Sequence, residues 1–244
     1  MNIVGLVPAR CGSKSIANKN IKLLNGIPLL AYSIAAAILT RNIDGVLVST
    51  DSEEYANIAR QYGADIPFLR PVVISEDSSQ DIEFIQHYIA FIKDNNLKIP
   101  EMIVLLRPTA PLRNIELVEK AVEYMNKNSE ATSLRSAHRS QVIPYRLFKK
   151  TGKYMVPFLT HIKYREYFNF PRQAYEQAYQ PNGYVDIIRP SVLQSSGLLF
   201  GDKIKIWETE KVADIDEMDD YDYTKKLIDD SKYTKLINYF KNNF

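Results

Sequence analysis

The chain has 244 residues, enough for one α/β domain with a sizeable core and a smaller appended lobe. Its hydrophobic fraction of 45% and charged fraction of 25% are those of an ordinary soluble globular protein. The formal net charge of +2 is nearly balanced, which argues against binding to nucleic acid or a membrane surface through bulk charge.

The cysteine content and the N-terminus both indicate a reducing compartment. Cys11 is the single cysteine, so no intramolecular disulfide can form. The first residues lack the charged lead and long apolar run of a signal peptide. No apolar stretch approaches the roughly 20 residues that span a bilayer. We therefore expect a cytoplasmic protein.

Strand and helix patterns alternate along the chain. Short apolar runs predict strands at residues 3–7, 45–50, 102–106, 184–188 and 204–207. Helical spacing of apolar residues predicts helices over residues 29–39, 53–62, 82–92, 115–125 and 227–240. Asn114 is expected to cap the fourth of these helices, with Leu117 on its buried face. The alternation predicts an α/β fold with a mostly parallel sheet covered on both faces.

The segment at about residues 140–180 breaks this regular pattern. It is rich in aromatic residues and contains several prolines, and its periodicity is weak. These features predict an extended excursion that packs on a partner subunit. We expect a single domain over residues 1–244, with this excursion as its dimerisation and substrate lobe.

The loop after the first predicted strand has the composition of an anion site. Arg10 and Lys14 can neutralise a triphosphate, and Gly12 permits close approach of the backbone to a ligand. Ser13, not a lysine, follows Gly12, so this is not a P-loop, and no G-x-G-x-x-G occurs in the chain. Ligands bind beyond the carboxyl ends of strands in open α/β sheets, which favours a functional role. The alternative is a solvated basic loop.

An acidic segment near the C-terminus contains a candidate metal site. Asp214 and Asp216 are two residues apart, so on an extended backbone both carboxylates can face one Mg²⁺. Asp219 and Asp220 precede a helix and fit capping and dipole roles. The alternative is that the whole segment serves only as a helix start.

Several other polar residues have both a functional and a structural interpretation. Arg172 and Gln173 can recognise an anionic substrate, or they belong to a surface loop. Arg107 and Arg113 flank a Pro-Thr-Ala-Pro turn and can be simple loop charges. Asn182, followed by glycine, is typical of a turn.

Seven short motifs follow one another along the chain. They are Ala9-Arg10 with Ser13-Lys14 and Lys19-Asn20, Val48-Ser49-Thr50-Asp51, Leu69-Arg70-Pro71, the run from Leu106 to Arg113, Pro171-Arg172-Gln173, Pro181-Asn182-Gly183, and Asp214-Ile215-Asp216. In order and approximate spacing they resemble the acylneuraminate cytidylyltransferase family, which makes CMP-activated sialic acids and related nonulosonic acids. The resemblance implies a doubly wound α/β nucleotidyltransferase that acts as a homodimer and exchanges part of the excursion.

The resemblance also implies an activity and a site. The activity is Mg²⁺-dependent transfer of CMP from CTP to the anomeric hydroxyl of a nine-carbon acidic sugar, with release of pyrophosphate. The implied nucleotide-binding residues are Ala9, Arg10, Gly12, Ser13, Lys14, Lys19, Asn20, Ser49, Asp51 and Arg70. The implied substrate-binding residues are Arg107, Thr109, Arg146, Arg172, Gln173 and Asn182, with Arg172 at the sugar carboxylate. Asp214 and Asp216 are the implied Mg²⁺ ligands and, with Arg10 and Lys14, the implied catalytic set.

The chain departs from the family pattern in three places. Ser15 replaces a common glycine, Arg107 stands where N-acetylneuraminate enzymes often have glutamine, and residues 182–186 are less apolar than expected. These differences leave sialic, legionaminic and pseudaminic acids as candidate acceptors. The alternatives are a Kdo cytidylyltransferase, a GT-A-type glycosyltransferase, and a catalytically silent nucleotide- or sugar-binding module of the same fold.

Overall fold

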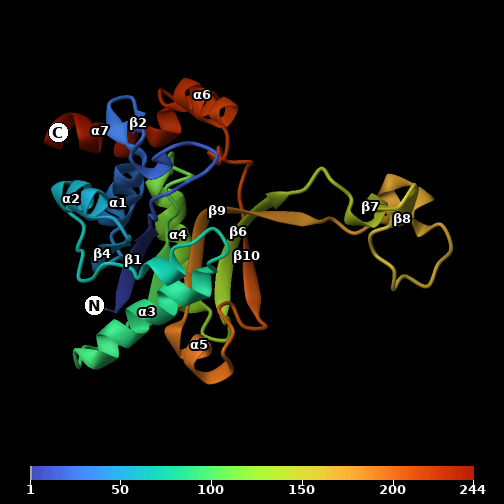
Figure 1. The fold of residues 1–244 in the computed structure, drawn as a ribbon, viewed down its shortest axis with the longest axis horizontal. Coiled ribbons are helices and arrows are strands. Elements are labelled where there is room, and N and C mark those ends of the chain that lie inside the picture. Colours follow the sequence, from blue (N-terminus) through green and yellow to red (C-terminus); the bar gives the residue numbers. More distant parts are fainter. Residues whose placement is uncertain (1) are drawn as a thin grey trace.

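A computed structural model of the protein describes residues 2–244. Its centre is a six-stranded sheet in the order β10-β6-β9-β5-β1-β4 (Figure 1). All strands run parallel except β9, which is antiparallel to both β5 and β6. The strands are β1 (Ile3–Pro8), β4 (Gly45–Ser49), β5 (Met102–Leu105), β6 (Ser133–Arg139), β9 (Tyr179–Ile188) and β10 (Ile204–Glu208). The predicted, mostly parallel sheet is confirmed.

Helices cover both faces of this sheet, as a doubly wound fold requires. The helices are α1 (Leu29–Leu39), α2 (Glu53–Gln61), α3 (Asp81–Asp94), α4 (Ile115–Lys127), α5 (Pro190–Ser196), α6 (Met218–Leu227) and α7 (Thr234–Asn243). On one face, α1, α2, α4 and α7 pack in a core that includes Val7 and Val48. On the other face, α3 and α5 pack in a core that includes Leu6 and Leu47. Neighbouring strand residues point to opposite faces, so one apolar run supplies both cores.

The order of the strands creates a crevice at the sheet edge. The chain enters at β1, continues to β4 on one side, and then crosses back to β5 on the other side of β1. Such a reversal opens a crevice beyond the carboxyl ends of the two strands that flank it. The loops after β1 and β5 leave the sheet there, and both contain predicted site residues.

Helix ends near this edge follow the local sequence signals. Ser52 caps α2, with its hydroxyl accepting a hydrogen bond from the amide of Tyr55 at 3.4 Å. Asn114 caps α4 as predicted, accepting from the amide of Glu116 at 3.0 Å. The predicted burial of Leu117 is wrong: it is 36% exposed, because the buried stripe of α4 passes through its neighbours.

The segment between β6 and β9 forms a lobe that projects from the main body (Figure 1). The end of β6 pairs with the start of β9, as at His138 and Gln180, and this two-stranded arm carries the lobe. The lobe contains a hairpin of β7 (Phe148–Thr151) and β8 (Tyr154–Pro157). The strand predicted at 184–188 is longer than expected because its first half builds the arm.

Two further predictions need correction. The final helix is not continuous: α6 and α7 are separated by a 3-10 turn at Ser231–Tyr233, whose start Asp230 caps. The elements β6 and α5 had no clear signal in the sequence. Within residues 2–244, no helix combines the length and apolar character needed to cross a membrane.

Candidate functional site

A cavity of about 280 Å³ opens beyond the carboxyl ends of β1 and β5. The predicted site residues in its wall are Arg10, Ser13, Lys19, Asn20, Arg70, Arg107 and Thr109. The remaining wall residues are Pro8, Ile74, Ser79, Gln80, Asp81, Phe84 and Pro108. A hollow of about 960 Å³ at the base of the arm is larger. The smaller cavity, however, has Arg10 and Lys19 of the predicted loop in its wall, whereas Lys14 and Gly12 of the same loop are not among its wall residues.

The cations of the loop after β1 converge on one carboxylate. Arg10 Nη2 lies 2.7 Å from Asp77 Oδ1, and Lys14 pairs with the other oxygen of Asp77. Hydrogen bonds from Lys14 and Arg10 lower the pKa of Asp77. Asn20 Nδ2 donates to the backbone carbonyl of Arg10 at 2.9 Å, which holds the loop in place. Gly12 has a φ of +75°, a conformation that favours glycine, and open space surrounds it. The side chains of Arg10 and Lys14, which already bind the carboxylate of Asp77, can therefore bind an anion.

Lys19 connects the cavity to the acidic segment. The residue is only 7% exposed, and its Nζ donates to the carbonyl of Ile215 at 2.8 Å and to Asp216 Oδ1 at 3.2 Å. The amide of Ile215 donates to the carbonyl of Thr109 at 2.7 Å. Burial, and to a lesser degree the charge of Asp216, raise the pKa of Asp214. Asp216, one of the two carboxylates implied as metal ligands, is thus held by a buried lysine.

Arg70 forms a rigid part of the cavity wall. It is 5% exposed, and its guanidinium donates to Ser49 Oγ at 3.0 Å and to the Ser49 carbonyl at 2.7 Å. The same guanidinium lies over the ring of Phe84 at 4.7 Å. Burial lowers the pKa of Arg70 to about 10, so it stays a cation at neutral pH. The stacked guanidinium of Arg70 and ring of Phe84 together form a flat part of the cavity wall.

Three residues implied for the nucleotide lie behind this wall. Ala9 and Ser49 are fully buried, and Ser49 holds Arg70. Asp51 accepts from the amide of Cys11 at 2.8 Å and from its thiol at 2.9 Å. The hydrogen bond to Asp51 raises the pKa of the Cys11 thiol, which disfavours a reactive thiolate. These residues support the loop and do not line the cavity.

Arg107 lies within a network of carboxylates. Its Nη1 and Nη2 lie 3.2 Å and 2.5 Å from the two oxygens of Asp81, and Nη2 is 3.7 Å from Asp186. Asp186 is fully buried, and Arg135 approaches it at 3.4 Å. Burial raises the pKa of Asp186, and the two arginines oppose that shift. Arg107 is therefore both a wall residue and a counter-ion for a buried acid.

Arg113 and Asn182 have structural contacts. Arg113 is completely buried and donates to the carbonyls of Tyr184 and Arg107, at 2.7 Å and 2.9 Å, and to Ser33 Oγ at 2.9 Å. Asn182, 5% exposed, donates to Thr209 Oγ1 at 2.7 Å. Neither side chain lines the cavity.

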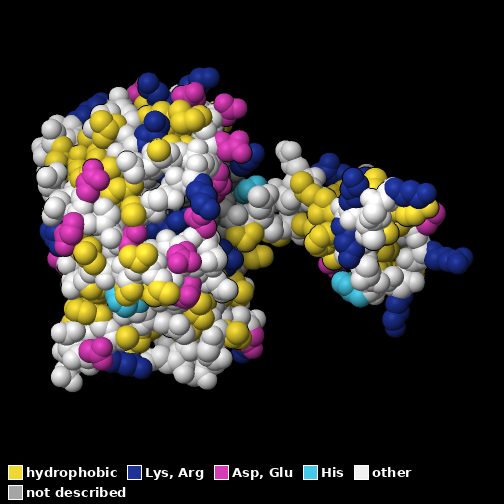
Figure 2. All heavy atoms as spheres, viewed as in Figure 1, with side chains coloured by type: hydrophobic (Ala, Val, Ile, Leu, Met, Phe, Trp, Pro, Cys, Tyr) yellow, Lys and Arg dark blue, Asp and Glu magenta, His cyan; other side chains and the backbone are white. Residues whose placement is uncertain are grey.

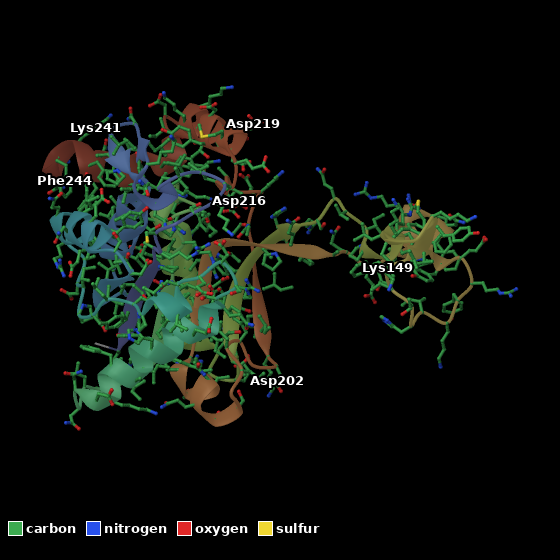
Figure 3. The ribbon with its side chains drawn as sticks, in the orientation of Figure 1. Lys149, Asp202, Asp216, Asp219, Lys241 and Phe244 are labelled. Carbon is green, nitrogen blue, oxygen red and sulfur yellow. The ribbon has the colours of Figure 1, made fainter. Side chains whose placement is uncertain are left out.

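The three remaining predicted substrate residues lie in the lobe. Arg146 donates to the carbonyl of Phe170 at 2.5 Å and lies over the ring of Tyr175 at 5.3 Å. Arg172 and Gln173 line a separate hollow of about 290 Å³. Figure 3 places Lys149 out on the lobe and Asp216 on the main body. The lobe residues are therefore not brought together with the cavity of the same chain.

The sequence analysis missed the wall that precedes and begins α3. Asp77, Ser79, Gln80 and Asp81 form a polar run before the apolar stripe of this helix, and Phe84 lies one turn later. Most of the predicted site residues in the cavity wall lie in loops that follow strands, whereas this segment enters the site from a helix start. A polar cluster rich in Ser and Asp was the available signal.

Comparison with known proteins identifies similar chains. Residues 4–192 match the family described as cytidylyltransferase. An N-acylneuraminate cytidylyltransferase from Escherichia coli is 32% identical over 222 residues, which cover 90% of this chain and 50% of that protein. A CMP-N,N'-diacetyllegionaminic acid synthase from Legionella pneumophila is 40% identical over 129 residues, 50% of this chain and 53% of that protein. The chain thus spans about half the length of these curated relatives.

Solved structures support the fold. The structure of a CMP:2-keto-3-deoxy-manno-octonic acid synthetase complexed with CTP superposes with a TM-score of 0.67, covering 93% of this chain and 98% of that one. The identity is 14%, so this likeness concerns the fold alone. The nucleotidyltransferase type of doubly wound sheet is confirmed.

Proposed function

Because the chain belongs to the cytidylyltransferase family, we propose that it transfers CMP from CTP to the anomeric hydroxyl of a nine-carbon 2-keto acid sugar. The observation that carries this proposal is the cavity lined by Arg10 and Lys19, with Lys19 paired to Asp216 of the acidic segment. The relatives named for N-acylneuraminate and for N,N'-diacetyllegionaminic acid support a nine-carbon acceptor. The single cysteine and the requirement for CTP support a cytoplasmic setting.

The side chains of the cavity suit in-line nucleotidyl transfer. The hydroxyl oxygen of the sugar attacks the α-phosphorus, the bond to the β-phosphate oxygen breaks, and pyrophosphate leaves while the hydroxyl proton is lost. Negative charge grows on the leaving group, and Arg10 and Lys14 neutralise it once the triphosphate replaces Asp77. Lys19 stays fixed by its carbonyl partner and orients the phosphates.

The acidic pair fits a divalent cation. Among residues 2–244, no three His, Cys, Asp or Glu side chains gather as a metal site. Mg²⁺, however, is usually held by one or two carboxylates together with phosphate oxygens and water. The raised pKa of Asp214, caused by burial with a contribution from Asp216, marks negative charge that a cation would stabilise. Bound there, Mg²⁺ would neutralise charge on the phosphates.

The lobe supports a homodimer that completes the sugar side of the site. Arg172, Gln173 and Arg146 lie away from the cavity of their own chain, so a role in substrate binding would require the cavity of a neighbouring copy. The lobe also exposes Met155 and Tyr164, which are 70% and 72% exposed. Figure 2 shows Lys and Arg side chains gathered on the same lobe. Exposed apolar side chains of this kind are typical of protein contacts. A basic lobe suits the carboxylate of the sugar.

Pyrophosphate release tests the proposed function. The purified chain receives CTP and Mg²⁺ with N-acetylneuraminic, legionaminic, pseudaminic or Kdo acid added separately. We expect release with one nine-carbon acid and loss of release with EDTA. Release with Kdo alone would favour the eight-carbon alternative. CTP binding without release would favour a glycosyltransferase or a silent module.

A further inference from the structure

Asp81 places a carboxylate in a cavity proposed for two anionic substrates. It is the first residue of α3, and its side chain is 33% exposed in the cavity wall. An acid in a first helical turn suits the helix dipole. That role does not require its bidentate pairing with Arg107, which lies in the loop after β5.

Arg107 is clamped in the position that makes this pairing. A Cβ on Gly183, whose φ is +63°, would lie 2.9 Å from Arg107 Cδ, so the side chain runs directly against the backbone. Asp186 attracts the same guanidinium from within the sheet. The guanidinium therefore remains beside Asp81 and neutralises it. A neutralised carboxylate repels triphosphate and sugar acid much less than a lone one.

The pairing leaves hydrogen-bonding capacity on Asp81. A carboxylate has about four lone-pair sites, and the two contacts with Arg107 use about half of them. The remaining sites accept hydrogen bonds and donate none, so they suit hydroxyl groups and not phosphate or carboxylate oxygens. The hydroxyls of a sugar ring are the matching chemistry among the proposed substrates.

Neighbouring residues define what surrounds this carboxylate. Asp77, four residues earlier, marks the side where Arg10 and Lys14 form the anion site. Phe84, three residues later on the same helix face, forms a flat wall with Arg70. In a nucleotide, the hydroxylated ribose ring joins the phosphates to a flat base. Along the chain, Asp81 likewise lies between Asp77, which marks the anion site, and Phe84, which belongs to the flat wall.

From these contacts we infer that Asp81 accepts hydrogen bonds from sugar hydroxyls in the cavity, and that Arg107 is the positioning residue that orients and neutralises it. The inference rests on the proposed function. Two sources offer this chemistry: the ribose of CTP and the ring of the acceptor sugar. Arg107 then acts through Asp81, in addition to serving as a wall residue.

The test compares wild type with Asp81→Asn, which keeps the shape and removes the charge. Pyrophosphate release is measured with CTP and 2′-deoxy-CTP, and as a function of acceptor concentration. If the ribose is the ligand, the preference for CTP over 2′-deoxy-CTP falls by about tenfold, the factor expected for one hydrogen bond to a charged group. If the acceptor is the ligand, its KM rises by a similar factor while the nucleotide preference holds. Unchanged values of both would overturn the inference.

Two controls separate this role from a structural one. Asp94→Asn changes an exposed carboxylate at the far end of α3, and we expect it to alter neither quantity. Arg107→Gln should raise the KM for CTP by restoring the charge of Asp81, and the double variant with Asp81→Asn should reverse that rise. Failure of the reversal contradicts the positioning role, because a packing defect at Arg107 would persist.

Nucleotide binding distinguishes failure of the inference from failure of the proposed function. If wild type releases no pyrophosphate with any acid, titration calorimetry with CTP and 2′-deoxy-CTP replaces the assay. If wild type and Asp81→Asn show the same preference for CTP over 2′-deoxy-CTP, the ribose is excluded as the ligand of Asp81. Because no acceptor sugar is then turned over either, the inference is overturned. If wild type prefers CTP over 2′-deoxy-CTP and Asp81→Asn abolishes this preference, the inference stands.

Discussion

Single residues at the sheet edge combine structural and chemical roles. Arg107 neutralises Asp81 in the cavity and approaches the buried Asp186 behind it. Arg135 approaches the same acid from β6, with its guanidinium over the ring of Phe200 at 4.3 Å. Removing one partner from a buried ion pair commonly costs more than the pair contributes. Arg107 and Arg135 therefore balance the charge of Asp186, which lies buried in β9.

The buried carboxylate of Asp186 should make stability depend on pH. Burial raises its pKa, so the folded state holds the proton more tightly than the unfolded state does. Its contribution to stability is therefore greatest at low pH and declines as pH rises from the unfolded carboxyl's pKa toward the raised value. We expect the free energy of unfolding of Asp186→Asn to increase relative to that of wild type as the pH rises from about 4.5 to about 7, a range above the ordinary carboxyl pKa.

Urea unfolding at both pH values measures this difference. Asp202→Asn, an exposed carboxylate, is the matched control and should show no such trend. A variant that instead loses stability relative to wild type as pH rises would mean that Arg107 and Arg135 outweigh the burial of the charge.

Elements with strong local signals were predicted, and those that depend on distant partners were not. The apolar runs of β1, β4 and β5 and the cap of α4 are visible in the sequence alone. β6 has the sequence SLRSAHR, whose burial depends on pairing with β9 and β10. Arg135 lies in this strand because Asp186 is its cross-strand neighbour, a relation that a single sequence does not reveal.

The same distinction applies to the site. Arg10 was predicted because it follows a strand in a basic loop, and Lys19 was implied by the family resemblance; the structure places both in the cavity wall. Asp81 was missed because its significance comes from Arg107, 26 residues away. Arg113 had the appearance of a loop charge, yet its buried contacts with Tyr184 and Ser33 arise only in the folded chain.

The cap of α4 offers a test at the scale of one element. Asn114 accepts from the amide of Glu116, and the buried residues of α4 pack in the core on one face of the sheet. Replacing such a cap with alanine typically costs about 1 kcal/mol, because a helix amide loses its partner. We expect Asn114→Ala to lower the free energy of unfolding by about this amount, and Asn114→Asp to retain most of it. Denaturant unfolding measures both, and an equal loss in the two variants would contradict a capping role.

The whole molecule separates its functional residues into two parts. The main body contains the cavity and the acidic pair, and the lobe carries Arg146, Arg172 and Gln173 on an extended arm (Figure 1). One chain therefore does not assemble the full predicted set. In the proposed two-fold symmetric dimer, each lobe would serve the cavity of the partner, and two complete sites would form.

This arrangement predicts complementation between two inactive variants. Arg172→Ala removes a lobe cation, and Asp216→Ala removes a carboxylate of the main body. In a mixed dimer, one site carries both defects and the other carries neither. Co-expression of the two chains should therefore restore about a quarter of wild-type pyrophosphate release when subunits pair at random, although each variant alone is inactive. A matched pair, Arg10→Ala with Asp216→Ala, should restore nothing, because both changes lie in the main body and every site keeps one defect. If the first pair also restores nothing while mixed dimers form, the lobe does not act across the dimer.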